Sequence, residues 1–104
     1  NLINMNEADE NRTILQIINS DCWKCNEPMK LAILISGGTF CDPSEFNESQ
    51  VKIARENGVV LRENYSNTLQ EKYLANTCEH CGAFIGKFFL DDYLYSEDCK
   101  EIEL

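Results

Sequence analysis

The chain has 104 residues, of which 43% are hydrophobic and 26% charged, and its 18 acidic and 9 basic residues give a formal net charge of −9. A chain of this length forms one domain and can bury a core of its own. The basic residues stand singly and never in a run. Nucleic-acid binding normally needs a concentrated positive surface, so this charge disfavours DNA and RNA as partners.

No stretch of the chain reaches the roughly 20 consecutive apolar residues that a membrane-spanning helix needs. The longest apolar run, Leu31 to Ile35, has the length of a strand. The sequence also shows no basic segment followed by an apolar one, the pattern of a secretory signal. We therefore expect a cytoplasmic protein that does not enter a membrane.

The first third of the sequence predicts an arm and a hairpin. Residues 1–12 are polar and acidic without a steady period, which predicts a flexible N-terminal arm. Thr13 to Ile18 is rich in β-branched residues and predicts a strand, and Met29 to Ile35 predicts a second one. Cys22 and Cys25 lie between them in a Cys-x-x-Cys turn. A hairpin with such a turn at its tip can hold a metal ion, and the tip is called a zinc knuckle.

The middle of the chain predicts one short helix. Asn47 or Ser49 is placed to cap a helix over 50–57, and Gly58 lies where a helix-ending residue with a positive φ belongs. Val59 to Arg62 then predicts a return to strand.

The last third predicts a second knuckle followed by a less regular end. The polar residues 65–71 predict a loop, and Lys72 to Thr77 predicts a strand that leads into a second Cys-x-x-Cys turn over 78–82. The spacing of Phe and Leu in 83–95 fits a helix, and a strand that completes a second hairpin is the alternative. Acidic residues dominate 96–104, which predicts an acidic C-terminal tail.

The candidate metal ligands are the two Cys-x-x-Cys pairs, Cys22, Cys25, Cys78 and Cys81. Zinc prefers four soft or borderline ligands in a tetrahedron. Two cysteines separated by two residues present both sulfurs to one ion from a single tight turn. The two pairs together supply the four thiolates of a closed structural zinc site.

The residues that follow the two pairs support this interpretation. A knuckle needs a residue that tolerates positive φ directly after its second cysteine, and Asn26 and Gly82 stand at these positions. The spacer of 52 residues between Cys25 and Cys78 is longer than the roughly 15–20 residues of compact zinc sites. Loop-closure entropy grows only with the logarithm of length, so the longer spacer adds little cost.

Two other interpretations of the cysteines remain open at this point. Six cysteines in a small chain can form a disulfide framework, although the hydrophobic content is sufficient for a core without bridges. Cys22 and Cys25 can also be the redox pair of a thioredoxin-like thiol oxidoreductase. This second interpretation explains one Cys-x-x-Cys pair and leaves the other without a role.

Four further residues could be assigned functional roles. We expect His80 to point away from a metal that is saturated by sulfur, and we assign it no catalytic role. Trp23 is expected to pack over the site and shield the thiolates. Cys41 is expected to be a small buried residue and Cys99 an exposed or loosely packed thiol, with a disulfide between the two as the alternative.

Three segments resemble a group of uncharacterised bacterial zinc-ribbon proteins. They are Cys22 to Cys25 (C-W-K-C), Tyr73 to Ala83 (Y-x-A-N-x-C-x-x-C-G-A) and Gly86 to Leu90 (G-x-F-F-L). The resemblance covers most of Ile14 to Leu90 and is specific at the two knuckles, whereas the N-terminal arm and the acidic tail have no counterpart in the group. It implies intracellular zinc binding, and it implies no particular activity.

Together these patterns predict a small α+β domain of the zinc-ribbon or treble-clef type, with two zinc knuckles, β-hairpins and one or two short helices. We expect a flexible arm over 1–12, a zinc-binding domain over 13–95 and an acidic tail over 96–104. The expected function is that of a non-catalytic protein-interaction module with a structural Zn²⁺, whose protein partner carries a basic surface. A thiol oxidoreductase that uses Cys22 and Cys25 and a nucleic-acid-binding zinc ribbon are the alternatives.

Overall fold

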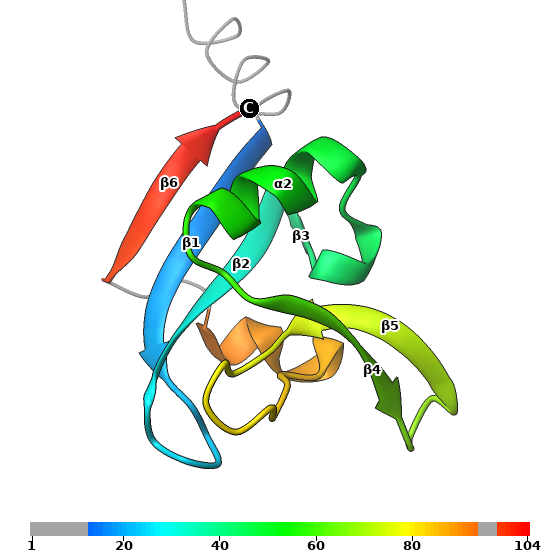
Figure 1. Ribbon diagram of the computed structural model, residues 1–104. Helices are drawn as coiled ribbons and strands as arrows, with labels where there is room; N and C mark the ends of the chain where they lie inside the picture. The colour runs from blue at the N-terminus through cyan, green and yellow to red at the C-terminus, as the bar shows by residue number, and fades with distance from the viewer. Residues whose placement is uncertain (1–12, 94–97) are drawn as a thin grey trace, which may run out of the picture.

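The computed structural model describes residues 13–93 and 98–104. These residues form a small α+β fold with a four-stranded antiparallel sheet in the order β3-β2-β1-β6, a separate β4–β5 hairpin and an α-helix (Figure 1). In chain order the elements are β1 (Thr13–Asp21), β2 (Pro28–Ser36), β3 (Thr39–Cys41), the 3₁₀ helix η1 (Pro43–Glu45), α2 (Glu48–Glu56), β4 (Leu61–Ser66), β5 (Glu71–Asn76), the 3₁₀ helix η2 (Lys87–Tyr93) and β6 (Cys99–Glu103).

Strands β1 and β2 form the hairpin that the sequence predicts. They pair without interruption from Thr13 opposite Ser36 to Asp21 opposite Pro28, and the Cys-x-x-Cys turn forms the tip. Each strand has nine residues, so the hairpin is long enough to run through the whole body of the molecule.

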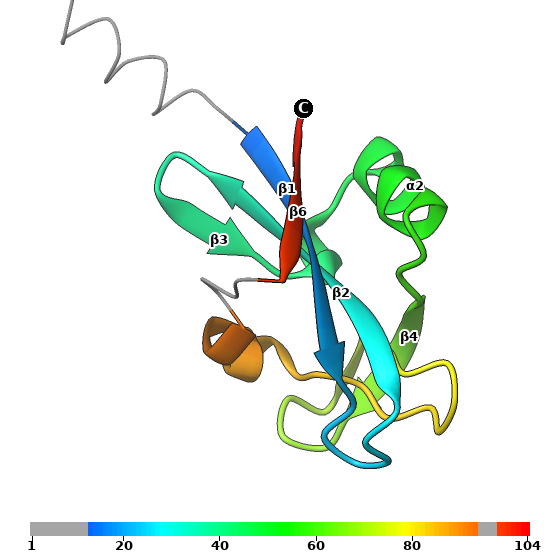
Figure 2. The same ribbon diagram turned by 90° about the vertical axis from the view of Figure 1, so that its left-hand side faces the viewer.

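The hairpin is covered on both faces, and this explains why β2 reads as a continuous apolar run. One face carries Leu31 and Ile33 against the knuckle cysteines and η2, and the other carries Ala32 and Leu34 against α2 and β4. Figure 2 shows α2 and η2 on opposite sides of the hairpin. A strand buried on both faces loses the alternation of apolar and polar residues that marks a half-exposed strand.

Helix α2 has the predicted caps. Asn47 is the N-cap: its side chain accepts from the Gln50 N–H at 2.9 Å, and the Gln50 side chain accepts from the Asn47 N–H at 2.9 Å. Gly58 follows the helix with φ +90°, a conformation that non-glycine residues rarely adopt. Among the described residues, no helix is long and apolar enough to cross a membrane.

The predicted boundaries around the second hairpin were wrong in part. Strand β4 begins at Leu61 rather than at Val59 and continues to Ser66, so most of the predicted loop over 65–71 is hairpin and turn. Tyr65 pairs with Lys72, and these polar side chains hide the strand from a search for apolar residues. In the segment after the second knuckle, Lys87–Tyr93 forms a 3₁₀ helix, so a helix and not the alternative strand is found there.

The expectation of a separate acidic tail over 96–104 does not hold for the residues described there. Cys99–Glu103 forms β6, which pairs with β1 and closes one edge of the sheet. Ile102 lies opposite Leu15 and packs against the core that α2 covers. The predicted arm over 1–12 and residues 94–97 lie outside the described part of the chain.

A buried side chain joins the β4–β5 hairpin to the main sheet. The Ala32 N–H donates to Asn76 Oδ1 at 2.8 Å, and Asn76 Nδ2 donates to the Ala32 carbonyl at 3.1 Å. The side-chain amide of Asn76, which is 0% exposed, thus does for β2 what the peptide group of a neighbouring strand would do. It also fixes the chain two residues before Cys78, at the entrance to the second knuckle.

We expect Asn76→Ala to lower the free energy of unfolding by about 2–4 kcal/mol, because it leaves the buried N–H and carbonyl of Ala32 without partners. Asn76→Asp should cost at least as much, since one of its oxygens would face the Ala32 carbonyl. Urea unfolding measures both. The exposed turn residue Asn67 provides the matched control, and Asn67→Ala should stay within about 0.5 kcal/mol of the parent. Equal losses at positions 76 and 67 would contradict the assignment.

Candidate metal centre

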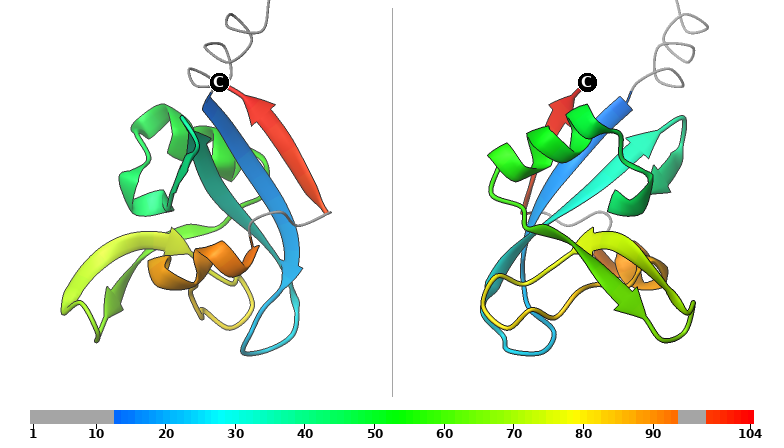
Figure 3. Two further views of the ribbon diagram at one scale, coloured as in Figure 1. Left: turned by 180° about the vertical axis from the view of Figure 1, so that it is seen from behind. Right: turned by 45° about the vertical axis from the view of Figure 1, so that its right-hand side comes forward.

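The structure brings the four predicted ligands together. The sulfurs of Cys22, Cys25, Cys78 and Cys81 all lie within 4.8 Å of one another, so these residues could hold a metal ion. The Sγ atoms of Cys22 and Cys81 are 3.6 Å apart, and those of Cys25 and Cys78 are 3.7 Å apart. Figure 3 shows the two loops that carry them, after β1 and after β5, side by side at one end of the molecule.

The two turns have the same internal hydrogen bonds. In each, the N–H of the first cysteine donates to the carbonyl five residues later, and its carbonyl accepts from the N–H four residues later. The bonds are Cys22 N–H to Glu27 O at 2.8 Å, Asn26 N–H to Cys22 O at 3.0 Å, Cys78 N–H to Ala83 O at 2.7 Å and Gly82 N–H to Cys78 O at 3.0 Å. The two turns therefore share one backbone hydrogen-bond pattern.

The backbone conformations agree with the sequence-based expectation. Asn26 has φ 66° and Gly82 has φ 79°, so the residue after each cysteine pair is in the left-handed region. This bend turns backbone N–H groups toward sulfur. The Lys24 N–H donates to Cys22 Sγ at 3.4 Å, a contact that favours the thiolate.

The sulfur separations match those of a tetrahedral thiolate cage. For metal–sulfur bonds of about 2.3 Å, a regular tetrahedron places its sulfurs about 3.8 Å apart. The Cys22–Cys81 and Cys25–Cys78 separations, 3.6 and 3.7 Å, are close to this value, and the other sulfur pairs lie within 4.8 Å. A disulfide requires about 2.05 Å, and all six cysteines are free. The disulfide-framework interpretation is therefore wrong for this fold.

The thiols of the first pair have opposite pKa shifts. Burial opposes ionisation of Cys22, but the N–H groups of Cys25 and Lys24 and the neighbouring thiols outweigh it and lower the Cys22 pKa to about 6. The N–H of Glu27 favours the Cys25 thiolate, but burial and hydrogen bonds to the thiols of Cys81, Cys78 and Cys22 raise the Cys25 pKa to about 12. The Cys22 thiol therefore ionises readily, and the negative charge of its thiolate opposes ionisation of the neighbouring Cys25 thiol. A divalent cation at the centre removes this conflict.

The site is part of the hydrophobic core. Cys22 and Cys78 are buried among Ile18, Leu31 and Leu90, whereas Cys25 is half-buried and Cys81 is exposed. Atoms of the core hold the two inner sulfurs in place, and the outer two close the cage toward solvent. Four sulfur donors complete a tetrahedron, so the donor set leaves no position for a reacting water.

Trp23 and His80 lie beside the cage. Trp23 is 63% exposed, and its Nε1 donates to the Phe84 carbonyl at 3.1 Å. It therefore links the first knuckle to the segment after the second one and does not cover the sulfurs to the extent expected. His80 is 47% exposed, with its Nε2 3.6 Å from Glu79 Oε1, and it is not one of the clustered ligands.

The suggested disulfide between Cys41 and Cys99 is excluded. Cys41 belongs to β3 and Cys99 to β6, the two edge strands of a sheet in which β2 and β1 lie between them. Three strand spacings separate them by about 14 Å, and a disulfide tolerates about 7 Å between Cα atoms. Burial raises the pKa of Cys41, and hydrogen bonding to Glu45 adds to the shift, so this thiol stays protonated.

Comparison of the chain with protein-family models, with curated proteins and with solved structures finds no match. The resemblance to bacterial zinc-ribbon proteins accordingly stays a prediction that depends on the quoted motifs. The geometry of the sulfurs does not depend on it.

Replacing either buried ligand, Cys22→Ser or Cys78→Ser, should weaken divalent-metal binding by more than about a hundredfold, since even residues that only orient a ligand contribute 10–100-fold. Competition against a chromophoric chelator measures the affinity. Cys99→Ser is the matched control because Cys99 is half-buried in the same core but lies outside the cluster. Unchanged metal affinity in Cys78→Ser would disprove the four-sulfur site.

Proposed function

We propose that this chain is a structural-zinc module whose four clustered cysteines hold one Zn²⁺ and whose role is to bind a protein partner without catalysing a reaction. The observation that carries the first half is the sulfur geometry, with separations of 3.6 and 3.7 Å across the two knuckles. The second half follows from the charge and from the chemistry of a closed site.

The donor set favours zinc over the other common cations. Thiolates are soft ligands that select zinc, copper(I) and iron–sulfur centres over magnesium and calcium. Tetrahedral coordination by four sulfurs is the ordinary structural site of Zn²⁺. The resemblance to zinc-ribbon proteins at C-W-K-C and at the closing knuckle points the same way.

Zinc in this place would act on the fold and not on a substrate. A structural Zn²⁺ contributes about 10–16 kcal/mol of apparent binding free energy in small peptides, comparable to the whole stability of a domain. Here it would tie the tip of the β1–β2 hairpin to the chain after β5. With four sulfurs around it, the ion would offer no open position for hydrolytic chemistry.

The charge of the chain favours a basic protein partner. The formal net charge is −9, and four thiolates around a divalent cation make it more negative. Such a surface attracts a positively charged protein and repels nucleic acid at a distance. The exposed aromatic side chains Trp23 and Phe89, each 63% exposed, add apolar contact area near the knuckles.

A thiol oxidoreductase is the second candidate, because a lowered pKa at Cys22 beside a raised one at Cys25 is the pattern of a redox pair. However, Cys22 is 1% exposed, which closes it to attack by or on a substrate. The sulfurs of Cys78 and Cys81 also lie against this pair, a feature that a redox motif does not require.

We expect native mass spectrometry to find one zinc per chain, with Cys41 and Cys99 alkylated and the other four cysteines protected. A strong chelator should then expose all six cysteines and abolish the cooperative unfolding transition, because the cage joins the tip of the β1–β2 hairpin to the chain after β5. A metal-free chain that keeps its tertiary structure and reacts first at Cys22 would support the oxidoreductase instead. One iron per chain would keep the cage and contradict the choice of zinc.

The zinc-loaded protein should retain protein partners from a bacterial lysate at low ionic strength, and raising the salt from about 0.05 to 0.5 M should release them because screening shortens the range of the attraction. Affinity capture at the two salt concentrations measures this. Heparin and duplex DNA columns serve as controls and should not retain the protein. Salt-insensitive retention of an acidic partner would contradict the charge argument.

A further inference from the structure

One edge of β2 is only partly paired. Its first edge pairs with β1 along its whole length, whereas its second edge pairs with β3 over Leu34 to Ser36 and with the Asn76 side chain at Ala32. Toward the knuckle, β2 continues for four more residues beyond Ala32. The second edge is open there.

The strand alternation identifies the backbone groups on this open edge. The Ala32 N–H and carbonyl point away from β1, since both bond to Asn76. Backbone direction repeats every two residues in an antiparallel strand, so the N–H and carbonyl of Lys30 point the same way. Within the described residues, neither group has a hydrogen-bond partner. The Asn76 amide pairs with the N–H and carbonyl of Ala32. The N–H and carbonyl of Lys30 are therefore the next donor and acceptor along the same edge of β2, and they are unpaired within the described residues.

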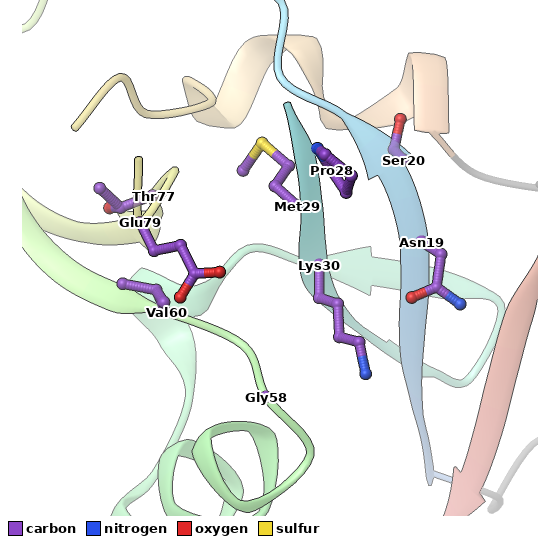
Figure 4. Close-up of a pocket in the computed structure, with 9 residues that line it drawn as sticks. All are labelled: Asn19, Ser20, Pro28, Met29, Lys30, Gly58, Val60, Thr77 and Glu79. Atoms are coloured by element: carbon purple, nitrogen blue, oxygen red, sulfur yellow. The ribbon is translucent and has the colours of Figure 1, made fainter. Parts of the chain in front are cut away.

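A cleft of about 190 Å³ lies in front of this pair. Figure 4 shows Pro28 and Lys30 on one side of it, Val60, Thr77 and Glu79 on the other, and Asn19 beyond the β2 strand. The volume is below the roughly 300–1,000 Å³ of sites for drug-sized ligands. A narrow chain suits it better than a bulky molecule.

The charges around the cleft favour a basic occupant. Glu79 is 63% exposed, and its carboxylate projects toward β2 in Figure 4. Asp21, opposite Pro28 at the end of the hairpin, is exposed as well; it is the neighbour of the lining residue Ser20 and does not itself line the cleft. The Lys30 ammonium is turned to the other end of the cleft, where it donates to the Asn57 carbonyl at 3.5 Å. It thus does not neutralise Glu79.

We propose that this cleft binds an extended, lysine-bearing peptide segment of a partner, which adds to the open edge of β2 at Lys30. The backbone of the segment exchanges hydrogen bonds with the N–H and carbonyl of Lys30, in line with the Asn76 amide at Ala32, and a lysine of the segment approaches Glu79. The inference rests on the proposed interaction role, for which it names the docking site and the chemistry of the partner.

The test uses full-length zinc-loaded protein and a blocked pentapeptide, acetyl-Val-Lys-Val-Lys-Val-amide. In the free protein, the Lys30 amide should exchange with solvent at least tenfold faster than the Ala32 amide, since only the latter is bonded. Adding the peptide should shift the NMR signal of the Lys30 amide and slow its exchange at least tenfold. The acidic analogue with glutamate in place of lysine should bind at least tenfold more weakly.

Three variants separate the contributions. Lys30→Pro removes the edge N–H without touching the β1 ladder and should abolish binding, since proline is tolerated where an edge N–H faces outward. Lys30→Ala keeps the N–H and should bind the peptide as the parent does. Glu79→Gln should weaken binding of the lysine peptide about tenfold and leave the weak acidic analogue unchanged or improved. A peptide N-methylated at its central valine provides the same control from the ligand side.

Several outcomes would overturn the proposal. They are no shift at Lys30 at millimolar peptide, equal binding of the N-methylated peptide, or an equal effect from N-acetyl-lysine amide alone, which would make the cleft a site for a small cation. Zinc content is measured on the same samples. One zinc per chain with no peptide binding refutes the docking site and leaves the metal assignment intact, whereas peptide binding without zinc refutes the metal assignment alone.

Discussion

The contact that the rest of the structure depends on is the one between four sulfurs. Cys25 and Cys78 are separated by 52 residues of sequence, and the structure places their sulfurs 3.7 Å apart. Four thiols packed within 4.8 Å are not a stable arrangement on their own account, because forming one thiolate makes the next one harder to form. A cation that accepts all four sulfurs removes this penalty and binds the two knuckles to each other. The hairpin, the core around Leu31 and the second knuckle then become one cooperative unit.

The knuckles could be predicted from sequence because everything they need is local. Two cysteines, a spacing of two residues and a following Asn26 or Gly82 suffice to specify the turn, and its backbone conformation follows from these residues. Helix α2 was predictable for the same reason, since Asn47, Gln50 and Gly58 cap it within twelve residues of sequence. In these segments local chemistry and tertiary structure require the same conformation.

The elements that sequence reasoning missed depend on distant partners. Strand β6 has three charged residues out of five, so its composition is that of a solvated tail. Its Cys99 and Ile102 are nevertheless partly buried, because they pair with residues of β1 more than eighty positions earlier in the sequence. Asn76 reads as one more polar residue before a knuckle. Its role becomes visible only when Ala32, 44 residues away, is placed beside it. Composition carries no information about such pairings, because the same polar side chain can either face solvent or form the backbone hydrogen bonds that a neighbouring strand would otherwise form.

The cage and the cleft are mechanically connected. One wall of the cleft, Pro28 and Lys30, continues from the first knuckle, and the other, Thr77 and Glu79, flanks Cys78 in the second. Thr77 is itself fixed by its N–H to the Val60 carbonyl at 2.9 Å and by the amide of Asn64. The width of the cleft is therefore set by the same four sulfurs that join the knuckles. A module of this kind needs no moving part to make partner binding depend on the metal. Without the cage, the described residues join the two walls through the Asn76 amide, the Trp23–Phe84 hydrogen bond and a shared core, and the four sulfurs add the direct link between the knuckles.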